Sequence, residues 1–132
     1  MTDHRPHSIR TPLARVRHLG PARAGTGHFW HQRLTSVANV PLTIATVLIV
    51  IGLLGRNQSA VAQILGSTPV AMVMLLFVIT SVYHMWLGMQ VIIEDYVHDE
   101  LIKLIVLMSN TFFSFTVGLA GVFAILKLSF GL

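Results

Sequence analysis

Residues 83–96 read Tyr-His-Met-Trp-Leu-Gly-Met-Gln-Val-Ile-Ile-Glu-Asp-Tyr, and this stretch decides how the rest of the chain is interpreted. Its second residue, His84, lies inside a long apolar run without formal charge, and acidic residues stand near its end. An ionisable side chain within such a run is costly unless it faces protein or a bound group. The stretch therefore predicts a membrane-spanning helix with a candidate functional site on one face.

A helical wheel places His84, Gly88 and Asp95 on one face of this helix. Eleven residues rise about 16 Å, so His84 lies near mid-membrane and Asp95 near the cytoplasmic boundary. A neutral imidazole is a common iron ligand, and Gly88 leaves room for a flat group, which suggests haem. Arg33 could then supply a cation for the haem propionates. The alternative is a histidine that only hydrogen-bonds to another helix, and the spacing by itself slightly favours this alternative.

A bis-histidine haem would need its second ligand from another chain, because His84 is the only histidine within a predicted span. Asp95 and Tyr96 suggest a second site, for a quinone head group. A tyrosine hydroxyl can donate to a carbonyl oxygen, and a nearby carboxylate can relay a proton. The alternative is interfacial anchoring by Tyr96 and a solvated Asp95, which is the stronger interpretation of an isolated Asp-Tyr pair.

The composition is that of a polytopic membrane protein. Hydrophobic residues make up 54% of the 132 residues and charged residues only 11%, against about a quarter in soluble domains. Six of the nine Lys and Arg residues lie at or before Arg33, where a topological role explains the basic charge and nucleic-acid binding is excluded. The chain has no cysteine, so it cannot by itself hold an iron–sulfur cluster.

The sequence predicts an all-α membrane protein with three transmembrane helices, at about residues 34–54, 70–93 and 104–126. Residues 28–132 would form one membrane-anchor domain, and residues 1–27 a basic, flexible cytoplasmic tail. The positive-inside rule keeps the N-terminus in the cytoplasm and places the C-terminus outside. Residues 55–69 are expected to be a polar loop.

Two predicted spans carry a stripe of polar or small residues, which favours packing against protein rather than lipid. The stripe on the first span is Ser36, Asn39, Thr43 and Thr46, and that on the third is Asn110, Ser114, Gly118 and Gly121. Because the bundle is thin, we expect it to need a partner that shields its polar faces.

The residues His84, Gly88, Asp95 and Tyr96 resemble the second-helix signature of the D-type small membrane-anchor subunit of succinate dehydrogenase (complex II). The segment His-Phe-Trp-His-Gln-Arg-Leu-Thr-Ser, residues 28–36, is similar to the entry to that family's first helix. The resemblance covers about residues 28–126. It implies that His84 is an axial ligand of haem b, that Tyr96 and Asp95 belong to the ubiquinone site, and that Arg33 lies near haem propionates or quinone.

The resemblance implies a non-catalytic subunit of a succinate:quinone oxidoreductase in the tricarboxylic acid cycle and respiratory electron transport. Its partners would be a C-type anchor with the second haem ligand, an iron–sulfur subunit and a flavoprotein with FAD, all held at membrane lipid. The absence of a convincing presequence favours the bacterial inner membrane over the mitochondrial one. A haem-free structural anchor, a small proton-conducting transporter subunit and a higher oligomer of the complex stay open as alternatives.

Overall fold

The computed structural model describes residues 25–131, which form four helices: α2 (Gly25–Leu53), α3 (Gln58–Gly66), α4 (Thr68–Tyr96) and α5 (Glu100–Phe130). The three long helices are long and apolar enough to cross a membrane, which confirms the predicted all-α fold with three spans. Most of the predicted tail, residues 1–24, lies outside the described residues. The division into tail and anchor domain therefore stays a prediction.

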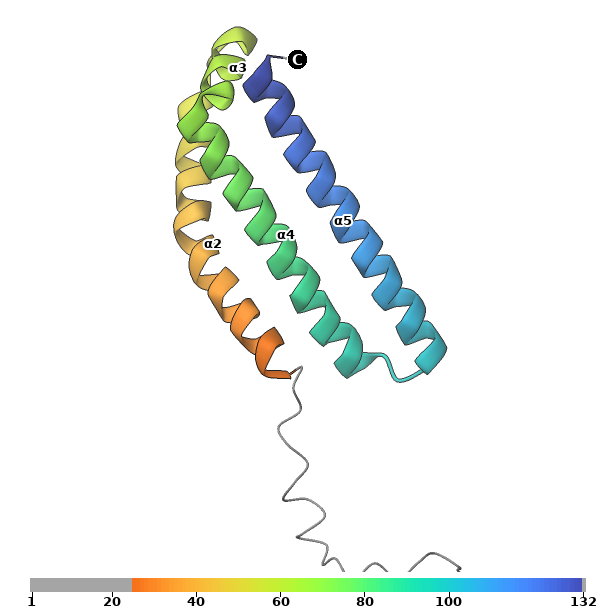
Figure 1. Ribbon diagram of the computed structural model, residues 1–132. Coiled ribbons are helices and arrows are strands. Elements are labelled where there is room, and N and C mark those ends of the chain that lie inside the picture. The colour runs from red at the N-terminus through yellow and green to blue at the C-terminus, as the bar shows by residue number, and fades with distance from the viewer. Residues whose placement is uncertain (1–24, 132) are drawn as a thin grey trace, which may run out of the picture.

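The middle span, α4, is the central helix of the bundle, because it packs against both α2 and α5 (Figure 1). The start of α2, the end of α4 and the start of α5 lie at one end of the bundle. The short α3 lies at the other end, beside the end of α5. Residues 83–96 therefore run along the central helix toward the end of the bundle that carries Glu94, Asp95, Asp99 and Glu100.

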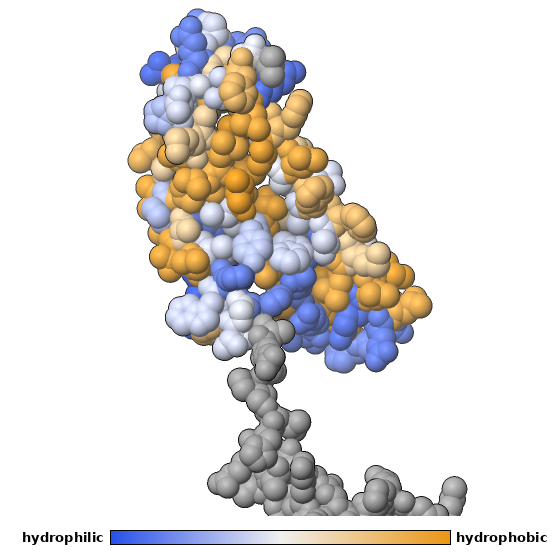
Figure 2. Space-filling view, viewed as in Figure 1, coloured by the Kyte–Doolittle hydropathy of each residue, from blue (hydrophilic) through white to orange (hydrophobic). Residues whose placement is uncertain are grey.

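The bundle is apolar outside and partly polar inside, the reverse of a soluble domain. Figure 2 shows hydrophobic residues along most of the exposed helix surface, with hydrophilic residues gathered at both ends. Of the six residues that are buried within the described part of the chain, three are polar; the six are Thr35, Ala71, Leu87, Ile93, Asn110 and Ser114. Lipid tails solvate the apolar exterior, so close packing and hydrogen bonds between helices hold such a bundle together.

The stripe of small residues predicted on the third span faces α4. A Cβ atom at Gly118 would lie 3.3 Å from Val82 Cγ1, and one at Gly121 would lie 2.8 Å from Val78 Cγ1. The glycines therefore let α5 approach α4 closely, as the sequence predicts. Asn110, on the same stripe, donates from Nδ2 to the carbonyl oxygen of Trp86 at 3.1 Å.

The stripe predicted on the first span contacts protein only in part. Asn39 Oδ1 accepts hydrogen bonds from the hydroxyls of Thr80, at 2.7 Å, and Ser81, at 3.4 Å. Ser36 and Thr43 are exposed, and Ser36 donates only to the carbonyl oxygen of Gln32 on its own helix. The α4-facing surface of α2 is therefore rotated slightly from the predicted one.

The expectation of a loop at residues 55–69 is wrong, because most of this segment is α3. Asn57 suggested a loop, but it caps the helix, with Oδ1 accepting from the backbone N–H of Ala60 at 2.9 Å. A Cβ atom at Gly66 would lie 2.7 Å from the carbonyl oxygen of Leu128, so α3 packs tightly on the end of α5. Pro69 lies in the first turn of α4 rather than in a connection.

Candidate functional site

The imidazole of His84 lies partly buried in the contact between α4 and α2. Its Nδ1 is 2.9 Å from Thr35 Oγ1, and its Nε2 is 3.3 Å from Gln32 Nε2. Both ring nitrogens thus contact the first long helix, and the ring points into protein rather than toward lipid. This agrees with the expectation that His84 faces protein or a bound group, and within this chain it faces protein.

The Nε2 atom of His84 carries the lone pair that an iron ligand needs. The amide nitrogen of Gln32 can only donate, so Nε2 must accept in this contact. The other end of the same amide, Gln32 Oε1, is buried and has no hydrogen-bond partner within residues 25–131. A buried carbonyl without a partner is costly, and this cost offsets part of what the Gln32 contact contributes. The donor chemistry of His84 therefore fits haem iron once the amide swings aside.

Gly88 lies one turn from His84 and faces the same Gln32. A Cβ atom at Gly88 would lie 3.3 Å from Gln32 Nε2, so any larger residue would press on that amide. This contact confirms that His84 and Gly88 share one face of α4, as the spacing predicts. The missing side chain gives space to the Gln32 amide beside the imidazole, and a flat group would take that space only by displacing the amide.

A cavity of about 420 Å³ lies next to this face, toward the start of α2. Its wall is formed from α2 and α4, by His28, Phe29, Gln32, Arg33, Leu87 and Val91. The guanidinium of Arg33 stacks over the Phe29 ring, 4.4 Å from its centroid. Arg33 is thus a cation at an apolar cavity beside His84, which is compatible with the predicted contact to an anionic haem propionate.

Asp95 and Tyr96 lie at the end of α4 and are both exposed, Tyr96 to 78%. Within residues 25–131 neither side chain makes a hydrogen bond, and neither lines the cavity next to Arg33. Asp99, a third residue at this end, is the N-cap of α5: its Oδ1 accepts a hydrogen bond from the backbone N–H of Ile102 at 2.9 Å. The Asp95–Tyr96 pair is therefore available to a ligand or a partner chain.

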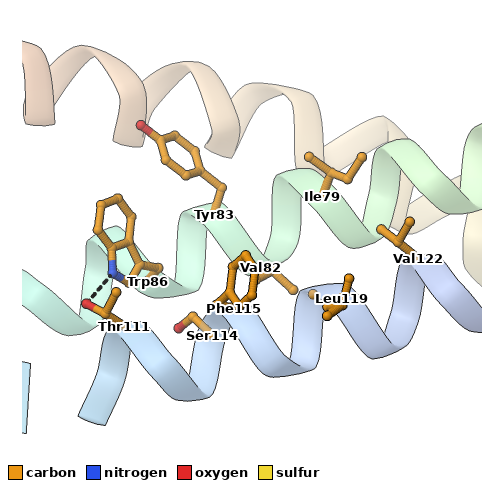
Figure 3. A pocket seen from close by; sticks show the side chains of 10 residues that line it. Ile79, Val82, Tyr83, Trp86, Thr111, Ser114, Phe115, Leu119 and Val122 are labelled. Carbon is orange, nitrogen blue, oxygen red and sulfur yellow. Dashed lines mark hydrogen bonds between the residues drawn. The ribbon is translucent and has the colours of Figure 1, made fainter. Parts of the chain in front are cut away.

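A second cavity, of about 470 Å³, lies between α4 and α5 and was not predicted (Figure 3). Tyr83 and Trp86 line it from α4, and Thr111 and Ser114 from α5. Trp86 Nε1 donates to Thr111 Oγ1 at 3.2 Å, and Figure 3 shows this bond at one end of the cavity. The spacing of three between the aromatic residues and between the two hydroxyl residues was the signal available in the sequence.

Two α2 residues that contact His84, Gln32 and Thr35, were not predicted from the sequence. Gln32, Thr35 and Asn39 are spaced by three and four, so they share one helical face, and all three contact α4. Tyr83 adds a neighbouring contact, with its hydroxyl 2.7 Å from His31 Nδ1. The polar stripe predicted for this helix included Asn39 and omitted the other two.

The described residues contain no group of three or more His, Asp or Glu side chains that could hold a metal ion together. Any metal bound at His84 would therefore need further ligands from a macrocycle or from another chain. The first candidate span also includes His28 and His31, so His84 is not the only histidine on a described span.

Fold and site together define a small multi-pass membrane protein with an intramembrane histidine held between two of its helices. The chain belongs to the succinate dehydrogenase/fumarate reductase transmembrane subunit family, whose pattern it matches over residues 7–122. This family is the one that the second-helix signature predicts. Because its relatives below are bacterial, the three apolar helices make the chain a multi-pass protein of the bacterial inner membrane.

Three relatives carry the name succinate dehydrogenase hydrophobic membrane anchor subunit. The Paracoccus denitrificans protein is 29% identical over 121 residues, covering 92% of this chain and 93% of the relative. The Rickettsia bellii protein is 30% identical over 111 residues, covering 82% and 86%. The Rickettsia conorii protein is 32% identical over 95 residues, covering 69% and 73%. No solved structure matches the chain.

Proposed function

We propose that this chain is the membrane-anchor subunit of a succinate:quinone oxidoreductase. Family membership and the names of the three relatives support this role. The chain has no cysteine for an iron–sulfur cluster, so FAD and the clusters would be held by flavoprotein and iron–sulfur partners. The chain would not be catalytic alone. It would fix its partners at the membrane and contribute to two sites.

The first site is half of a haem b site, and the observation that carries it is the position of His84. Its ring lies in the α2–α4 contact, with Nε2 accepting and with Gly88 and an apolar cavity beside it. His84 would be one axial ligand, Arg33 would bind a propionate, and a C-type anchor subunit would supply the other axial ligand. A haem bound there would supply a one-electron carrier within the membrane.

The second site is part of a ubiquinone pocket at the end of α4. The Tyr96 hydroxyl would donate to a quinone carbonyl oxygen, which orients the head group. The Asp95 carboxylate would hold and pass a proton as the quinone is reduced. Both side chains are exposed in this chain, so the partner subunits would complete the pocket and exclude water from it.

The N-terminus would lie on the cytoplasmic side, because the basic residues gather before Arg33. The end of α4 lies at the same end of the bundle as the start of α2, so Tyr96 would also face the cytoplasm (Figure 1). Soluble partners on that side could then deliver electrons to a quinone near the membrane boundary.

A haem-free structural anchor is a second candidate, and one observation favours it. Both ring nitrogens of His84 already have partners within the chain, which alone would stabilise the histidine in a membrane. An anchor of this kind would keep the same partners and the same α4 end, and would lack a b-type haem band.

Purification through a tag on this chain tests the proposed role. The expected result is co-purification of a flavoprotein and an iron–sulfur protein, with succinate oxidation measurable with an artificial acceptor. Recovery of the chain from detergent-solubilised membranes without these two partners would contradict the proposal. It would instead favour a transporter subunit with Asp95 and His84 on a proton path.

A further inference from the structure

We infer that Thr35 is a positioning residue for His84, whose hydroxyl determines which ring nitrogen carries the proton. This inference rests on the proposed haem site. It concerns the nitrogen opposite the one that would bind iron, and it adds a residue that the second-helix signature does not contain. The Thr35 hydroxyl has a single proton, and the atom to which it donates that proton decides the tautomer of His84.

The Thr35 hydroxyl donates its proton to its own helix. Its Oγ1 lies 2.7 Å from the carbonyl oxygen of His31 and 3.1 Å from that of Gln32, and carbonyl oxygens can only accept. Toward His84 Nδ1, at 2.9 Å, the hydroxyl oxygen can therefore only accept. It follows that Nδ1 carries the hydrogen and that Nε2 is left with the lone pair.

The contact on the other side of the ring leads independently to the same tautomer. The Gln32 amide nitrogen must donate, and it faces Nε2 at 3.3 Å. Thr35 at Nδ1 and Gln32 at Nε2 thus favour the same tautomer of His84, with the hydrogen on Nδ1. That arrangement is the one in which Nε2 can bind a metal while Nδ1–H is held by an outer partner.

Thr35 and Gln32 are nevertheless unequal partners. Thr35 is buried, at 8% exposure, and its hydroxyl is fully used by one ring nitrogen and two carbonyl oxygens. Gln32 makes the longer contact, and its Oε1 has no partner within the described residues. A ligand arriving at Nε2 would displace the Gln32 amide and leave the Thr35 contact in place. Thr35 therefore fixes the orientation of the ring through Nδ1. Gln32 donates to Nε2, the atom that would bind the metal, as long as no metal is bound there.

The matched control is Ser36, the next residue along α2. Its hydroxyl donates to the carbonyl oxygen of Gln32 at 2.7 Å, the same kind of bond that Thr35 makes to its own helix. Ser36 is exposed, and its hydroxyl bonds to Gln32 and not to His84. Replacing Ser36 removes a hydroxyl from the same helix turn without changing the partner of Nδ1, so it separates the role of Thr35 from a general effect on the helix.

The test is a redox titration of the haem in the purified complex, for wild type, Thr35→Val, Thr35→Ser and Ser36→Ala. Valine keeps the shape of threonine and removes the hydroxyl, whereas serine keeps the hydroxyl. An N–H bond to an outer acceptor makes imidazole a stronger ligand for ferric iron, and losing such a partner costs about 10–100-fold in metal binding. A tenfold weaker preference for ferric iron raises a one-electron midpoint potential by about 59 mV.

We expect Thr35→Val to raise the midpoint potential by this amount or to release the haem, and Thr35→Ser and Ser36→Ala to behave as wild type. An unchanged potential in Thr35→Val would overturn the inference, as would an equal shift in Thr35→Val and Thr35→Ser, which would indicate packing. Succinate oxidation with an artificial acceptor reports assembly in every sample. A wild-type complex without haem would instead overturn the haem proposal itself.

Discussion

His84 and Tyr96 lie on the same helix, twelve residues and about 18 Å apart, in opposite surroundings. The His84 ring is partly buried and contacts Thr35 and Gln32 through both nitrogens. Tyr96 is 78% exposed, and within residues 25–131 its hydroxyl has no partner. The chain thus supplies contacts for both ring nitrogens of His84 and, within the described residues, none for the Tyr96 hydroxyl.

This difference follows from the depth of the two residues in the membrane. A polar group in the hydrocarbon region must find partners within the protein, because lipid offers none. At the membrane boundary, water and head groups satisfy Tyr96 and Asp95 until a ligand or a partner subunit binds. Substitution of His84 should therefore change contacts within this chain, whereas substitution of Tyr96 should have a measurable effect only in the assembled complex.

The largest effect is expected from His84→Leu, which removes the proposed axial ligand and keeps the helix apolar. We expect the b-type haem band of the purified complex to be lost or strongly altered, since the other histidines of the described spans, His28 and His31, lie in the first two turns of α2, and His31 Nδ1 already contacts the Tyr83 hydroxyl. The matched control is His98→Leu in the α4–α5 connection, which should leave the absorption spectrum unchanged. An unaltered spectrum in His84→Leu would mean that the iron ligands come from other chains.

The next effect is expected from Tyr96→Phe, which removes the donor to the quinone carbonyl oxygen. Losing one hydrogen bond to a buried partner costs about 1–3 kcal/mol, or roughly 5–150-fold in quinone reduction. Succinate oxidation with an artificial acceptor should stay at the wild-type level. Tyr83→Phe is the matched control, because Tyr83 bonds to His31 instead, and it should keep quinone reduction. An equal loss in both assays would point to failed assembly rather than to a quinone contact.

A smaller effect is expected from Gly88→Leu, which fills the space beside His84 and Gln32. Overpacking of this kind costs about 1–3 kcal/mol, so haem should be retained less well while the complex still assembles. Gly52→Leu is the control, since nothing lies within 4 Å of a Cβ atom at Gly52. Haem retention in detergent, followed by absorbance, measures the difference. If both variants keep haem equally well, the bound group does not lie against Gly88.

The smallest effect is expected from Asp99→Ala, which removes the N-cap of α5. The loss should be about 1 kcal/mol of stability with quinone reduction unchanged, because Asp99 is bound to its own helix. Asp99→Asn keeps the cap and should match wild type in the thermal midpoint of the complex. A loss of quinone reduction in Asp99→Asn would show that the Asp99 carboxylate also takes part in quinone reduction, which would contradict a role confined to Asp95.

The sequence predicted the three spans and the face that His84 shares with Gly88, because long apolar runs and helical spacing are properties of single helices. It also predicted the glycine stripe on α5. It did not predict that Thr35 and Gln32 hold His84, because the rotation of α2 against α4 depends on packing between helices. The α3 helix was missed because its capping residue, Asn57, is also typical of loops.

The measurement that tests the account most directly is the difference spectrum, dithionite-reduced minus oxidised, of the complex purified through this chain. The proposed position of His84 in a half-site for haem predicts a b-type band in preparations that contain the flavoprotein and iron–sulfur partners. A complete, active complex without that band would contradict the haem site, and it would assign His84, Thr35 and Gln32 to a structural contact between α4 and α2.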